Sequence, residues 1–458
     1  MLERPHPRVV IVGAGPAGIG AADVLVNAGI RPILLDEGRT PGGQGYRKSD
    51  PALGLDLGYA QIADYKAIHA TFARLAGRID YRPETLAWSV DGGNVFTALR
   101  GEVERDALPF DRLILATGAT DRIAPVPGWT LPGVYSLGAA QVLLKDQGCA
   151  IGDEVVFYGS SPLLYLAAWQ YIEAGAGKVT ILDTTPFRAK IAASGRIAAA
   201  PAVLRQGLML MARLRMRGVR MRHGVADLHI HGDETVARIT YRWNGRQQSQ
   251  ACDAVAIGHG LRSETQLAEL AGCSFRFSDI FDQWQVETDR DGRGANGVYL
   301  AGDGTRIGGA IAAELSGRIA AHACLSDLGL GADDGEVAAL RQRRDAYWSA
   351  QDGLARAFAW PREALASLPD ETMLCRCESV TAGAVRTAAR AMTGISDINR
   401  IKALSRCGMG RCQSRICGLA AIEVAAAARG EPPAALTHFR TQPPVKPVFI
   451  PSPQRQEA

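Results

Sequence analysis

Five cysteines lie close together near the C-terminal end of the sequence. Cys375 and Cys377 form a C-x-C pair in "LCRCESV", and Cys407, Cys412 and Cys417 follow in "RCGMGRCQSRIC". Thiolates are soft ligands that suit zinc or iron–sulfur clusters. Because the sequence begins without the features of a signal peptide, we expect a cytoplasmic protein, in which clustered cysteines indicate metal or redox chemistry before structural disulfides.

The spacing of these cysteines narrows the choice of metal. Zinc sites usually separate the two cysteines of a pair by about two to four residues, whereas a C-x-C pair can hold one iron of a two-iron cluster. The glycines of "CGMGRC" leave backbone N–H groups that can bond cluster sulfurs and tune the cluster potential. We therefore predict a [2Fe–2S] cluster, with a zinc site and a structural remnant without metal as the alternatives.

Short helices must position the cysteine loops. The segment 379–406 reads as two helical pieces broken at Gly394, and Ser379 or Thr381 could cap the first piece. A charged helical segment precedes the cysteines, and a Pro-rich extended segment follows them. We expect that Pro-rich segment to form no core of its own and to lie across this protein or a partner.

The N-terminal region carries a second chemical signature, a glycine-rich turn. The apolar run Val9–Val12 suits a buried parallel strand and leads into Gly13-Ala-Gly-Pro-Ala-Gly18. Gly13 allows a tight turn, Gly15 the close approach of a pyrophosphate, and Gly18 helix-on-strand packing. Pro16 suits the first helical turn, whose free N–H groups form an anion site.

An acidic residue follows the next strand, "RPILLDEG", at the distance expected for a ligand of ribose hydroxyl groups. Asp36 and Glu37 both satisfy that spacing. Three further segments complete the pattern, namely "RTPGGQGYR", "FDRLILATGA" and "NGVYLAGDGTRIGGAIAAEL".

Together these segments resemble the two-dinucleotide-binding flavoproteins, the glutathione-reductase-like superfamily. The resemblance implies an α/β fold that binds FAD, with the helix after Gly309 directed at the flavin ring. The FAD-binding residues that it implies are Gly13, Gly15, Pro16, Ala17, Gly18, Asp36, Glu37, Gly43, Gln44, Arg47, Thr117, Gly118, Gly302, Asp303 and Ala310.

A second strand–turn–helix–strand unit, Asp153–Asp183, matches the NAD(P)H-binding unit of that superfamily. Its turn departs from the pattern, because Ser161 stands where the second glycine is expected and Leu164 where the third is expected. The candidate residues of this second nucleotide site are Gly159, Ser160, Ser161 and Asp183. We expect no NAD(P)H binding here, and predict either a retained packing domain or a site for a different nucleotide or flavin. The redox cysteine pair of the disulfide reductases has no counterpart, because the first cysteine is Cys149.

The cysteine window resembles the bacterioferritin-associated-ferredoxin-like [2Fe–2S] domain. That resemblance assigns the four ligands to Cys375, Cys377, Cys407 and Cys412, and leaves Cys417 as a packed neighbour. The predicted order of domains is an FAD-binding part (1–125), an inserted second Rossmann-like domain (126–256), the return of the FAD-binding domain (257–330), a helical linker (331–370), the [2Fe–2S] domain (371–430) and the Pro-rich tail (431–458).

This order resembles one family over nearly the full length: the FAD and [2Fe–2S] α-subunits of bacterial opine oxidases, hydroxyproline dehydrogenases and hydrogen cyanide synthase. The matching segments are "LLDEGRTPGGQGYR", "GSSPLLYLAAWQY" and the cysteine window. The resemblance implies an electron-transfer α-subunit of an amino- or imino-acid dehydrogenase. Its partner would be a flavoprotein β-subunit of the sarcosine- or glycine-oxidase type, and a small third subunit is a further candidate.

We therefore expect electrons from an amino or imino acid, oxidised in a partner, to pass through this chain to a quinone or another carrier. The alternatives are a self-contained NAD(P)H-dependent reductase and an assembly subunit without working cofactor sites. No Ser-His-Asp constellation or metal-hydrolysis signature is present, so no catalytic residue is assigned. The net charge of +4 gives no reason to expect nucleic acid, and electron delivery to a quinone would place the protein at the periphery of the inner membrane.

Overall fold

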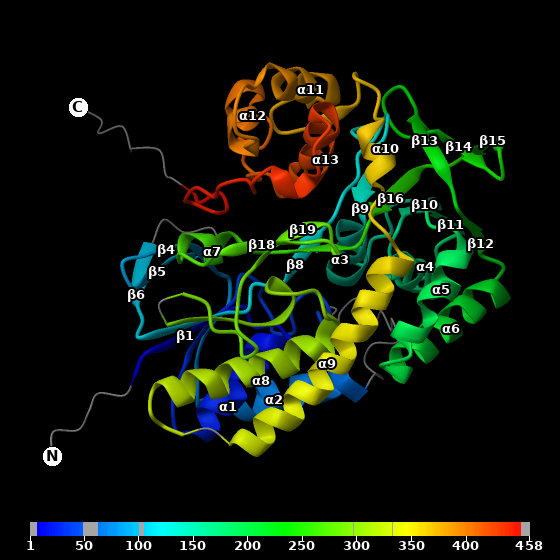
Figure 1. Ribbon diagram of the computed structural model, residues 1–458. Coiled ribbons are helices and arrows are strands. Elements are labelled where there is room, and N and C mark those ends of the chain that lie inside the picture. The colour runs from blue at the N-terminus through cyan, green and yellow to red at the C-terminus, as the bar shows by residue number, and fades with distance from the viewer. Residues whose placement is uncertain (1–6, 49–62, 100–104, 296, 332, 450–458) are drawn as a thin grey trace, which may run out of the picture.

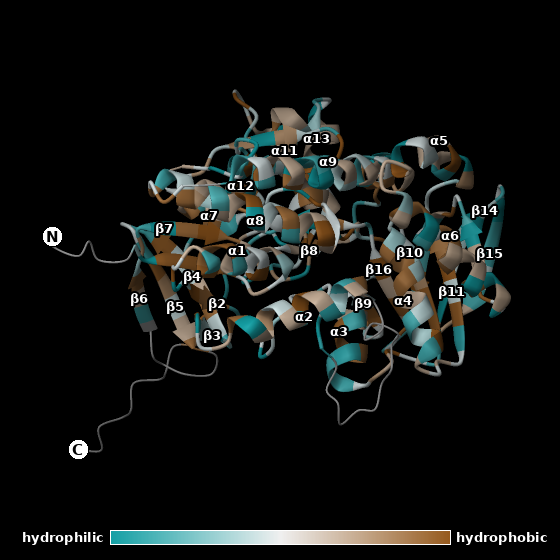
Figure 2. Ribbon diagram, turned by 90° about the horizontal axis from the view of Figure 1, so that it is seen from below, coloured by the Kyte–Doolittle hydropathy of each residue, from teal (hydrophilic) through white to brown (hydrophobic). Residues whose placement is uncertain are grey.

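The computed structural model describes residues 7–48, 63–99, 105–295, 297–331 and 333–449. It contains two parallel sheets, and a small helical domain lies beside them (Figure 1). The predicted fold class, a two-dinucleotide-binding flavoprotein with a small C-terminal helical domain, is confirmed. Figure 2 shows that the central strands of both parallel sheets are predominantly hydrophobic, as expected for strands covered on both faces.

The first sheet is built from strands distant in sequence, in the order β20-β7-β1-β2-β3. All neighbouring pairs are parallel. Its strands are β1 (Val9–Val12), β2 (Ile33–Leu35), β3 (Asp80–Arg82), β7 (Arg112–Leu115) and β20 (Val298–Leu300). Its helices are α1 (Pro16–Asn27), α2 (Ala63–Leu75) and α8 (Gly309–Asp327), and the 3-10 turn η3 (Gly302–Gly304) precedes α8.

Helices α1 and α8 pack closely because glycines line their contact. A Cβ added at Gly317 of α8 would lie 1.9 Å from the carbonyl oxygen of Ala17 in α1. One added at Gly20 of α1 would lie 2.8 Å from the carbonyl oxygen of Glu314. This contact holds the N-termini of both helices beside the carboxyl ends of β1 and β20.

Short antiparallel pieces accompany the first sheet. One three-stranded sheet has the order β4-β5-β6, β8 pairs with β17, and β18 pairs with β19. Their bounds are β4 (Thr85–Asp91), β5 (Asn94–Leu99), β6 (Arg105–Pro109), β8 (Ala119–Asp121), β17 (Leu261–Ser263), β18 (Phe275–Ser278) and β19 (Gln283–Val286), and α7 (Gln266–Leu270) lies between β17 and β18.

The second sheet is also parallel, with the order β12-β11-β10-β16-β9. Its strands are β9 (Val134–Ser136), β10 (Glu154–Gly159), β11 (Lys178–Asp183), β12 (Arg220–His223) and β16 (Ala254–Gly258), and its helices are α3 (Leu137–Gln147), α4 (Pro162–Glu173), α5 (Phe187–Ile197) and α6 (Pro201–Met216). An antiparallel sheet of β13 (Ala226–His231), β14 (Arg238–Trp243) and β15 (Arg246–Ala251) adjoins it. β16, the strand of this sheet that comes last in the sequence, ends at Gly258.

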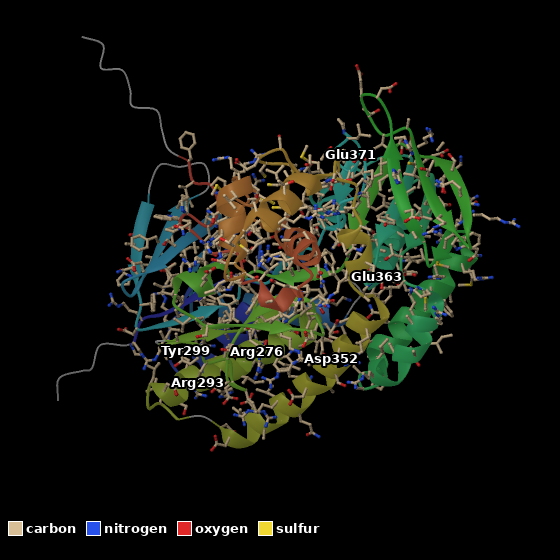
Figure 3. The ribbon with its side chains drawn as sticks, turned by 45° about the horizontal axis from the view of Figure 1, so that its top comes forward. Arg276, Arg293, Tyr299, Asp352, Glu363 and Glu371 are labelled. Atoms are coloured by element: carbon tan, nitrogen blue, oxygen red, sulfur yellow. The ribbon has the colours of Figure 1, made fainter. Side chains whose placement is uncertain are left out.

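A linker connects the two sheet domains to the helical domain. It contains α9 (Asp334–Ala357), which runs along α8 and then reaches α5, and α10 (Arg362–Ala366) (Figure 1). Asp352, labelled on α9 in Figure 3, accepts a hydrogen bond from the Arg306 guanidinium at 2.6 Å. The linker therefore packs against both domains.

The C-terminal domain is a small cluster of helices around the cysteine loops. Its elements are β21 (Met373–Cys375), β22 (Val380–Thr381), α11 (Ala382–Ala391), α12 (Ile398–Ser405), α13 (Gly418–Arg429) and η4 (Pro433–Ala435). The predicted pair of helices is confirmed. Thr381 caps α11 by accepting from the amide of Ala384, and Gly394 lies between the helices with a φ of +81°.

The described part of the Pro-rich tail lies across the chain itself. Leu436 is buried in the core of the C-terminal domain and Val445 in that of the first domain. The amide of Val445 donates to the carbonyl oxygen of Trp88 in β4 at 2.9 Å. The tail therefore forms no core of its own and lies across this chain, as expected, and it contributes side chains to the cores of both domains. Among the described helices, none combines the length and apolar character needed to cross a bilayer.

The α1–α8 contact leads to a stability prediction. We expect Gly317→Ala to lower the free energy of unfolding by about 1–3 kcal/mol, because the added methyl group meets backbone that cannot rotate away. The matched control is Gly195→Ala in α5, where an added Cβ meets nothing within 4 Å. This control should raise the stability by about 0.5–1 kcal/mol. Urea unfolding followed by circular dichroism measures both, and equal effects of the two variants would contradict the prediction.

Candidate functional site

The glycine turn between β1 and α1 leaves room for backbone contacts only. Gly13 has a φ of +107°, and a Cβ added there would lie 2.3 Å from the carbonyl oxygen of Ala116. A Cβ at Gly18 would lie 1.8 Å from the carbonyl oxygen of Gly13. Pro16 begins α1, and no side chain caps this N-terminus. The first-turn N–H groups therefore stay available to an anion such as a pyrophosphate.

Asp36, at the carboxyl end of β2, faces this turn. Its carboxylate accepts hydrogen bonds from the amides of Ala14, at 2.5 Å, and Gly38, at 2.6 Å. Burial raises the pKa of Asp36, and these two amides oppose that rise. Glu37 instead points to the tail, where it pairs with Lys446. The geometry thus favours Asp36 over Glu37 as the residue beside a bound ribose.

The segment 42–47 forms a second wall above the glycine turn. The amide of Gly42 donates to the carbonyl oxygen of Ala14 at 2.9 Å, and a Cβ at Gly43 would lie 3.0 Å from the Cα of Gly15. Further along, a Cβ at Gly45 would lie 3.9 Å from the Cβ of Ala310, at the N-terminus of α8. The segment therefore spans the distance between the N-termini of α1 and α8.

The end of this segment reaches the second domain. The Arg47 guanidinium pairs with Asp146 of α3, and both side chains are partly buried. Gln44, also predicted at the FAD site, is exposed on the same segment.

The opposite wall comes from the ends of β7 and β20. The Thr117 hydroxyl donates to the carbonyl oxygen of Glu264 at 2.6 Å. Asp303 accepts from the amides of Gly308, at 2.7 Å, and Gly309, at 3.1 Å, at the start of α8. Burial raises the pKa of Asp303, which these amides oppose. Gly302 lies against α1, because a Cβ there would be 2.9 Å from that of Ala17.

These residues fit a dinucleotide at the carboxyl edge of the first sheet, where such sheets bind ligands. The predicted residues gather there from β1–α1, β2, segment 42–47, β7 and the start of α8. Three polar atoms around this edge, namely Arg47 Nε, Thr305 Oγ1 and Arg306 Nε, are buried without a hydrogen-bond partner. Buried polar groups are normally bonded, so a bound cofactor offers the missing partners.

The orientation of the two acids leads to a binding prediction. Asp36→Asn should weaken FAD binding by about tenfold or more, because an amide cannot replace a charged acceptor of the loop amides and a ribose hydroxyl. Glu37→Gln is the matched control and should leave FAD affinity within about twofold, because Glu37 contacts the tail. Fluorescence titration of the flavin-depleted proteins measures both affinities. A larger loss in the Glu37 variant would reverse the assignment.

The second nucleotide site is organised differently. Gly159 retains the tight turn, because a Cβ there would lie 1.8 Å from the carbonyl oxygen of Gly258. The hydroxyl of the fully buried Ser161 accepts from the amide of Leu163 at 3.1 Å and so caps α4. Ser160 is bonded to the buried His259 ring, with 3.0 Å between Oγ and Nδ1. The first turn of α4 is thus bonded within the chain, unlike that of α1.

The acidic residue of this site is likewise engaged. Asp183 is fully buried and accepts from the Tyr165 hydroxyl at 2.7 Å and the Thr185 amide at 2.8 Å, and it pairs with Lys190 at 2.9 Å. Burial by itself raises the pKa of Asp183, but the neighbouring His223, Lys190 and hydroxyl groups outweigh it, so the net pKa is lowered. The carboxylate therefore serves an internal network.

Two aromatic residues of the linker cover the same edge of the second sheet. The Phe358 ring lies 4.8 Å from Lys190 Nζ, and the Trp360 ring lies 5.9 Å from that of His259. The capped helix, the engaged Asp183 and these aromatic side chains do not fit a bound NAD(P)H. The geometry instead supports the expected packing domain.

Burial of His259 leads to a pH prediction. Burial, reinforced by the charge of Arg122, lowers the pKa of His259 from 6.5 to about 3. Between these values the unfolded chain binds a proton that the folded chain does not, so stability is lost as the pH falls from 6.5 to about 3, by up to ~1.4 kcal/mol per pH unit. His259→Gln should flatten this slope. Urea unfolding at several pH values measures the slopes of the wild type and the variant, and equal slopes in the two proteins would contradict the prediction.

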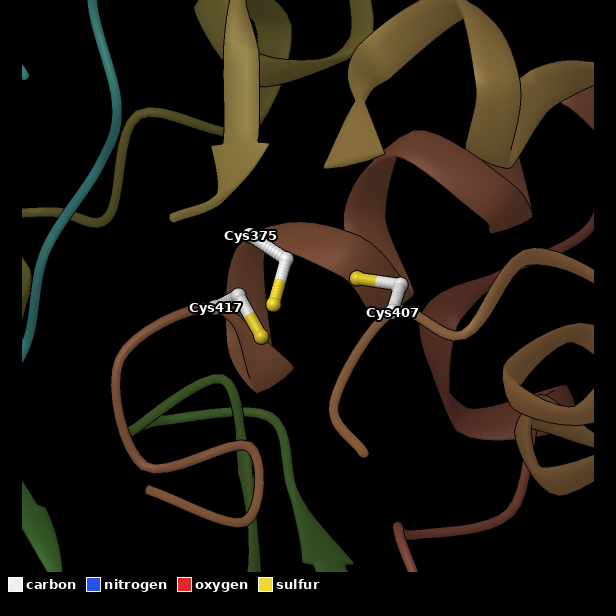
Figure 4. Close-up of side chains that lie close together, drawn as sticks. All are labelled: Cys375, Cys407 and Cys417. Atoms are coloured by element: carbon white, nitrogen blue, oxygen red, sulfur yellow. The ribbon is translucent and has the colours of Figure 1, made fainter. Parts of the chain in front are cut away.

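Three cysteines meet inside the C-terminal domain. The Sγ atoms of Cys375, at the end of β21, Cys407, after α12, and Cys417, before α13, all lie within 4.8 Å of one another (Figure 4). All three are buried. Bonds from Cys407 and Cys417, helped by the amides of Gly408 and Glu378, lower the pKa of Cys375 to about 2. A buried thiolate surrounded by thiols suits a soft metal centre.

Cys377 and Cys412, the other two predicted ligands, are half-buried and lie in hydrogen-bond contact with each other. Burial and the neighbouring Cys412 raise the pKa of Cys377. The predicted set is thus brought together as Cys375 with Cys407 and Cys377 with Cys412. Cys417, expected to be a packed neighbour, joins the first group. Cys417 stands directly before a helix, where a thiolate is stabilised. This position could have indicated from the sequence that Cys417 is a candidate ligand.

The loops that carry the cysteines have unusual backbone conformations. Ser379, Arg406, Gln413 and Ser414 have φ values of +53°, +65°, +46° and +64°. Such conformations are costly for residues other than glycine and gather at functional sites. These conformations cost backbone stability, and they direct several thiols inward. The resulting all-sulfur donor set fits an iron–sulfur cluster.

The cysteine loop docks on the FAD-binding domain through a buried ion pair. Arg415 Nε lies 2.7 Å from Glu264 Oε2, and only 10% and 9% of the two side chains are exposed. Burial by itself raises the pKa of Glu264, but Arg415 outweighs it and the net pKa is lowered. The backbone of Glu264 also accepts from the Thr117 hydroxyl and donates to the carbonyl oxygen of Gly118 at 3.0 Å. A single residue thus touches both the predicted flavin site and the cysteine loop.

Comparison with known proteins agrees with this geometry. The pyridine nucleotide-disulphide oxidoreductase family model matches residues 7–320, and the sarcosine oxidase A3 domain model matches residues 371–452. An opine oxidase subunit from Rhizobium meliloti is 37% identical and aligns over 96% of this chain and 86% of its own length. The HcnB subunit of hydrogen cyanide synthase from Pseudomonas protegens is 31% identical over 89% of each chain.

A solved structure shares the fold. The crystal structure of L-proline dehydrogenase from P. horikoshii superimposes with a TM-score of 0.71 at 21% identity, covering 97% of this chain and 78% of that one. At this identity the similarity shows the architecture only.

Proposed function

Because the chain belongs to the same family as these opine oxidase subunits, within the pyridine nucleotide-disulphide oxidoreductases, we propose that it is the FAD and [2Fe–2S] electron-transfer α-subunit of an amino- or imino-acid dehydrogenase complex. Membership confirms the resemblance predicted from the sequence, and with it an oxidoreductase of an FAD-dependent family that acts in a complex. The proposal adds the cluster, the direction of electron flow and the partner.

The contact made by Glu264 is the observation that carries the proposal. Its backbone bonds to Thr117 and Gly118 at the predicted FAD site, while its carboxylate holds Arg415, between Cys412 and Cys417. A protein whose two cofactors act independently does not need one residue that contacts both cofactor sites. A protein that transfers electrons between its cofactors does need such a contact, because the two cofactors must stay at a fixed short separation.

The proposed division of labour follows from the chemistry of the two groups. When bound, FAD accepts electrons in pairs and a [2Fe–2S] cluster passes them singly. The partner β-subunit, a flavoprotein of the sarcosine- or glycine-oxidase type, converts a CH–NH group to C=N with loss of two electrons and two protons. A quinone takes up the two electrons with two protons and becomes a quinol.

The residues of this chain have positioning roles in that scheme. Asp36 and the uncapped first turn of α1 would hold the dinucleotide, and Asp303 fixes the start of α8 through the amides of Gly308 and Gly309. The buried Glu264–Arg415 pair keeps the cysteine loop docked. The self-contained NAD(P)H reductase receives no support, because Asp183 and the first turn of α4 are already bonded within the chain.

The test is anaerobic purification of the tagged chain from its native host, followed by analysis of flavin, iron and sulfide. The complex should contain a second flavoprotein and should oxidise at least one of proline, hydroxyproline, opines and glycine. NADH and NADPH should leave the flavin absorbance unchanged. Rapid bleaching by either nucleotide would support the reductase instead, and a colourless protein would leave only an assembly role.

Cysteine variants of the same chain test the metal centre. Cys375→Ser should abolish iron binding, since Cys375 has neighbouring thiols on both sides. Comparison of Cys412→Ser with Cys417→Ser identifies the fourth ligand. The variant that lacks this ligand should lose more than about half of its iron, whereas the other variant should keep its iron. Cys149→Ser is the control, because Cys149 is exposed and distant in sequence. Zinc in the wild-type protein would overturn the proposed cluster.

A further inference from the structure

The outer faces of α5 and α6 form an exposed apolar surface on the second domain. Its large side chains are 47–79% exposed: Phe187, Ile191, Leu208, Met209 and Met216. Phe187 and Ile191 lie one helical turn apart on α5, and Leu208 and Met216 lie two turns apart on α6, so each pair shares a face. We call these five residues the α5–α6 surface.

The helices that carry this surface are rigidly packed on their other sides. Ala193 and Ile197 of α5 pack against Ala357 of α9. Leu214 of α6 is fully buried in the core of the second domain. Just after α6, Arg217 pairs with Glu173 at 3.1 Å. The apolar side chains are therefore held outward by a fixed framework, which lowers the entropic cost of binding a partner.

The charges carried by α5, α6 and the residues that follow them are all of one sign. Every charged residue from 187 to 226 is an Arg or a Lys, and the neighbouring Glu173 of α4 is already paired with Arg217. Within the described chain, no carboxylate pairs with Arg188, Arg196, Arg205 or Arg215. Apolar side chains that share two helices with unpaired cations complement a partner surface that combines apolar and acidic side chains.

The surface is linked to the predicted flavin site through two helices. A Cβ at Gly309, at the start of α8, would lie 3.4 Å from Gln351 Nε2 of α9, and one at Gly353 would lie 2.8 Å from Ile197 Cγ1 of α5. Helix α9 therefore connects the N-terminus of α8 to the inner face of α5, as the arrangement of α8, α9 and α5 in Figure 1 shows. A partner docked on the outer face is separated from the end of α8 by α5 and α9.

We infer that the α5–α6 surface is the docking site for the flavoprotein β-subunit, which presents an apolar patch bordered by Asp and Glu. The inference rests on the proposed function, which supplies that subunit. The cations are almost all Arg and the apolar residues include Met, and protein interfaces are enriched in both. A bilayer interface is the competing occupant and is an outcome of the test.

The experiment uses the β-subunit released from the native complex and the FAD-loaded chain. Leu208→Asp combined with Met216→Asp should weaken association by about 100-fold, because it places two carboxylates against an apolar and acidic partner. Arg205→Glu combined with Arg215→Glu should slow association and reduce its dependence on salt. The matched control is Leu330→Asp, which changes a side chain that is 53% exposed outside this surface and should leave affinity within about twofold.

Analytical ultracentrifugation and stopped-flow association give these values, and the FAD absorbance of each variant reports its folding. Wild-type affinity in the Asp double variant would overturn the inference while leaving the proposed function intact. Loss of binding to phosphatidylglycerol vesicles with unchanged affinity for the β-subunit would overturn it in favour of the membrane. A native preparation that contains no second flavoprotein would overturn the proposed function and the inference together.

Discussion

The buried ion pair between Glu264 and Arg415 is the interaction on which the arrangement of the whole chain depends. It joins two domains that are far apart in sequence and that each have a core of their own. Removing either partner would leave an uncompensated charge at a buried interface, at a cost of about 3–5 kcal/mol. Replacing both residues by apolar ones could preserve stability, but it would remove the charged contact between the cysteine loop and Glu264, whose backbone bonds to Thr117 and Gly118. The pair therefore serves geometry more than stability.

Much of the first domain follows from short-range signals in the sequence. Gly13 and Gly18 meet backbone oxygens so closely that no side chain fits, and such constraints appear in the sequence as glycines at fixed spacing. The same holds for the helices around the cysteines, where Thr381 as a cap and Gly394 as a break suffice to place them. Asp36 and Glu37 could not be distinguished in this way, because their difference lies in the contact of Glu37 with Lys446 of the tail.

Features that depend on contacts between distant segments could not be predicted. Cys417 joins Cys375 and Cys407 only because α13 begins where β21 ends in space. The contact between the Phe358 ring and Lys190 depends on the path of the linker, and no local sequence pattern specifies that path. The sequence indicates that the tail lies across other parts of the protein, but it does not tell that Leu436 is the side chain that enters a core, because that core belongs to other segments.

The two domains with parallel sheets differ in how the turn before the first helix is bonded. In the first domain the turn before the helix is left uncapped, and its N–H groups stay free for a ligand. In the second, Ser161 supplies the missing acceptor from within the chain, and Asp183 bonds to Tyr165 and Lys190. Each of these bonds occupies a group that a nucleotide would otherwise need. A domain held together in this way presents a fixed outer surface, and the exposed faces of α5 and α6 are part of it.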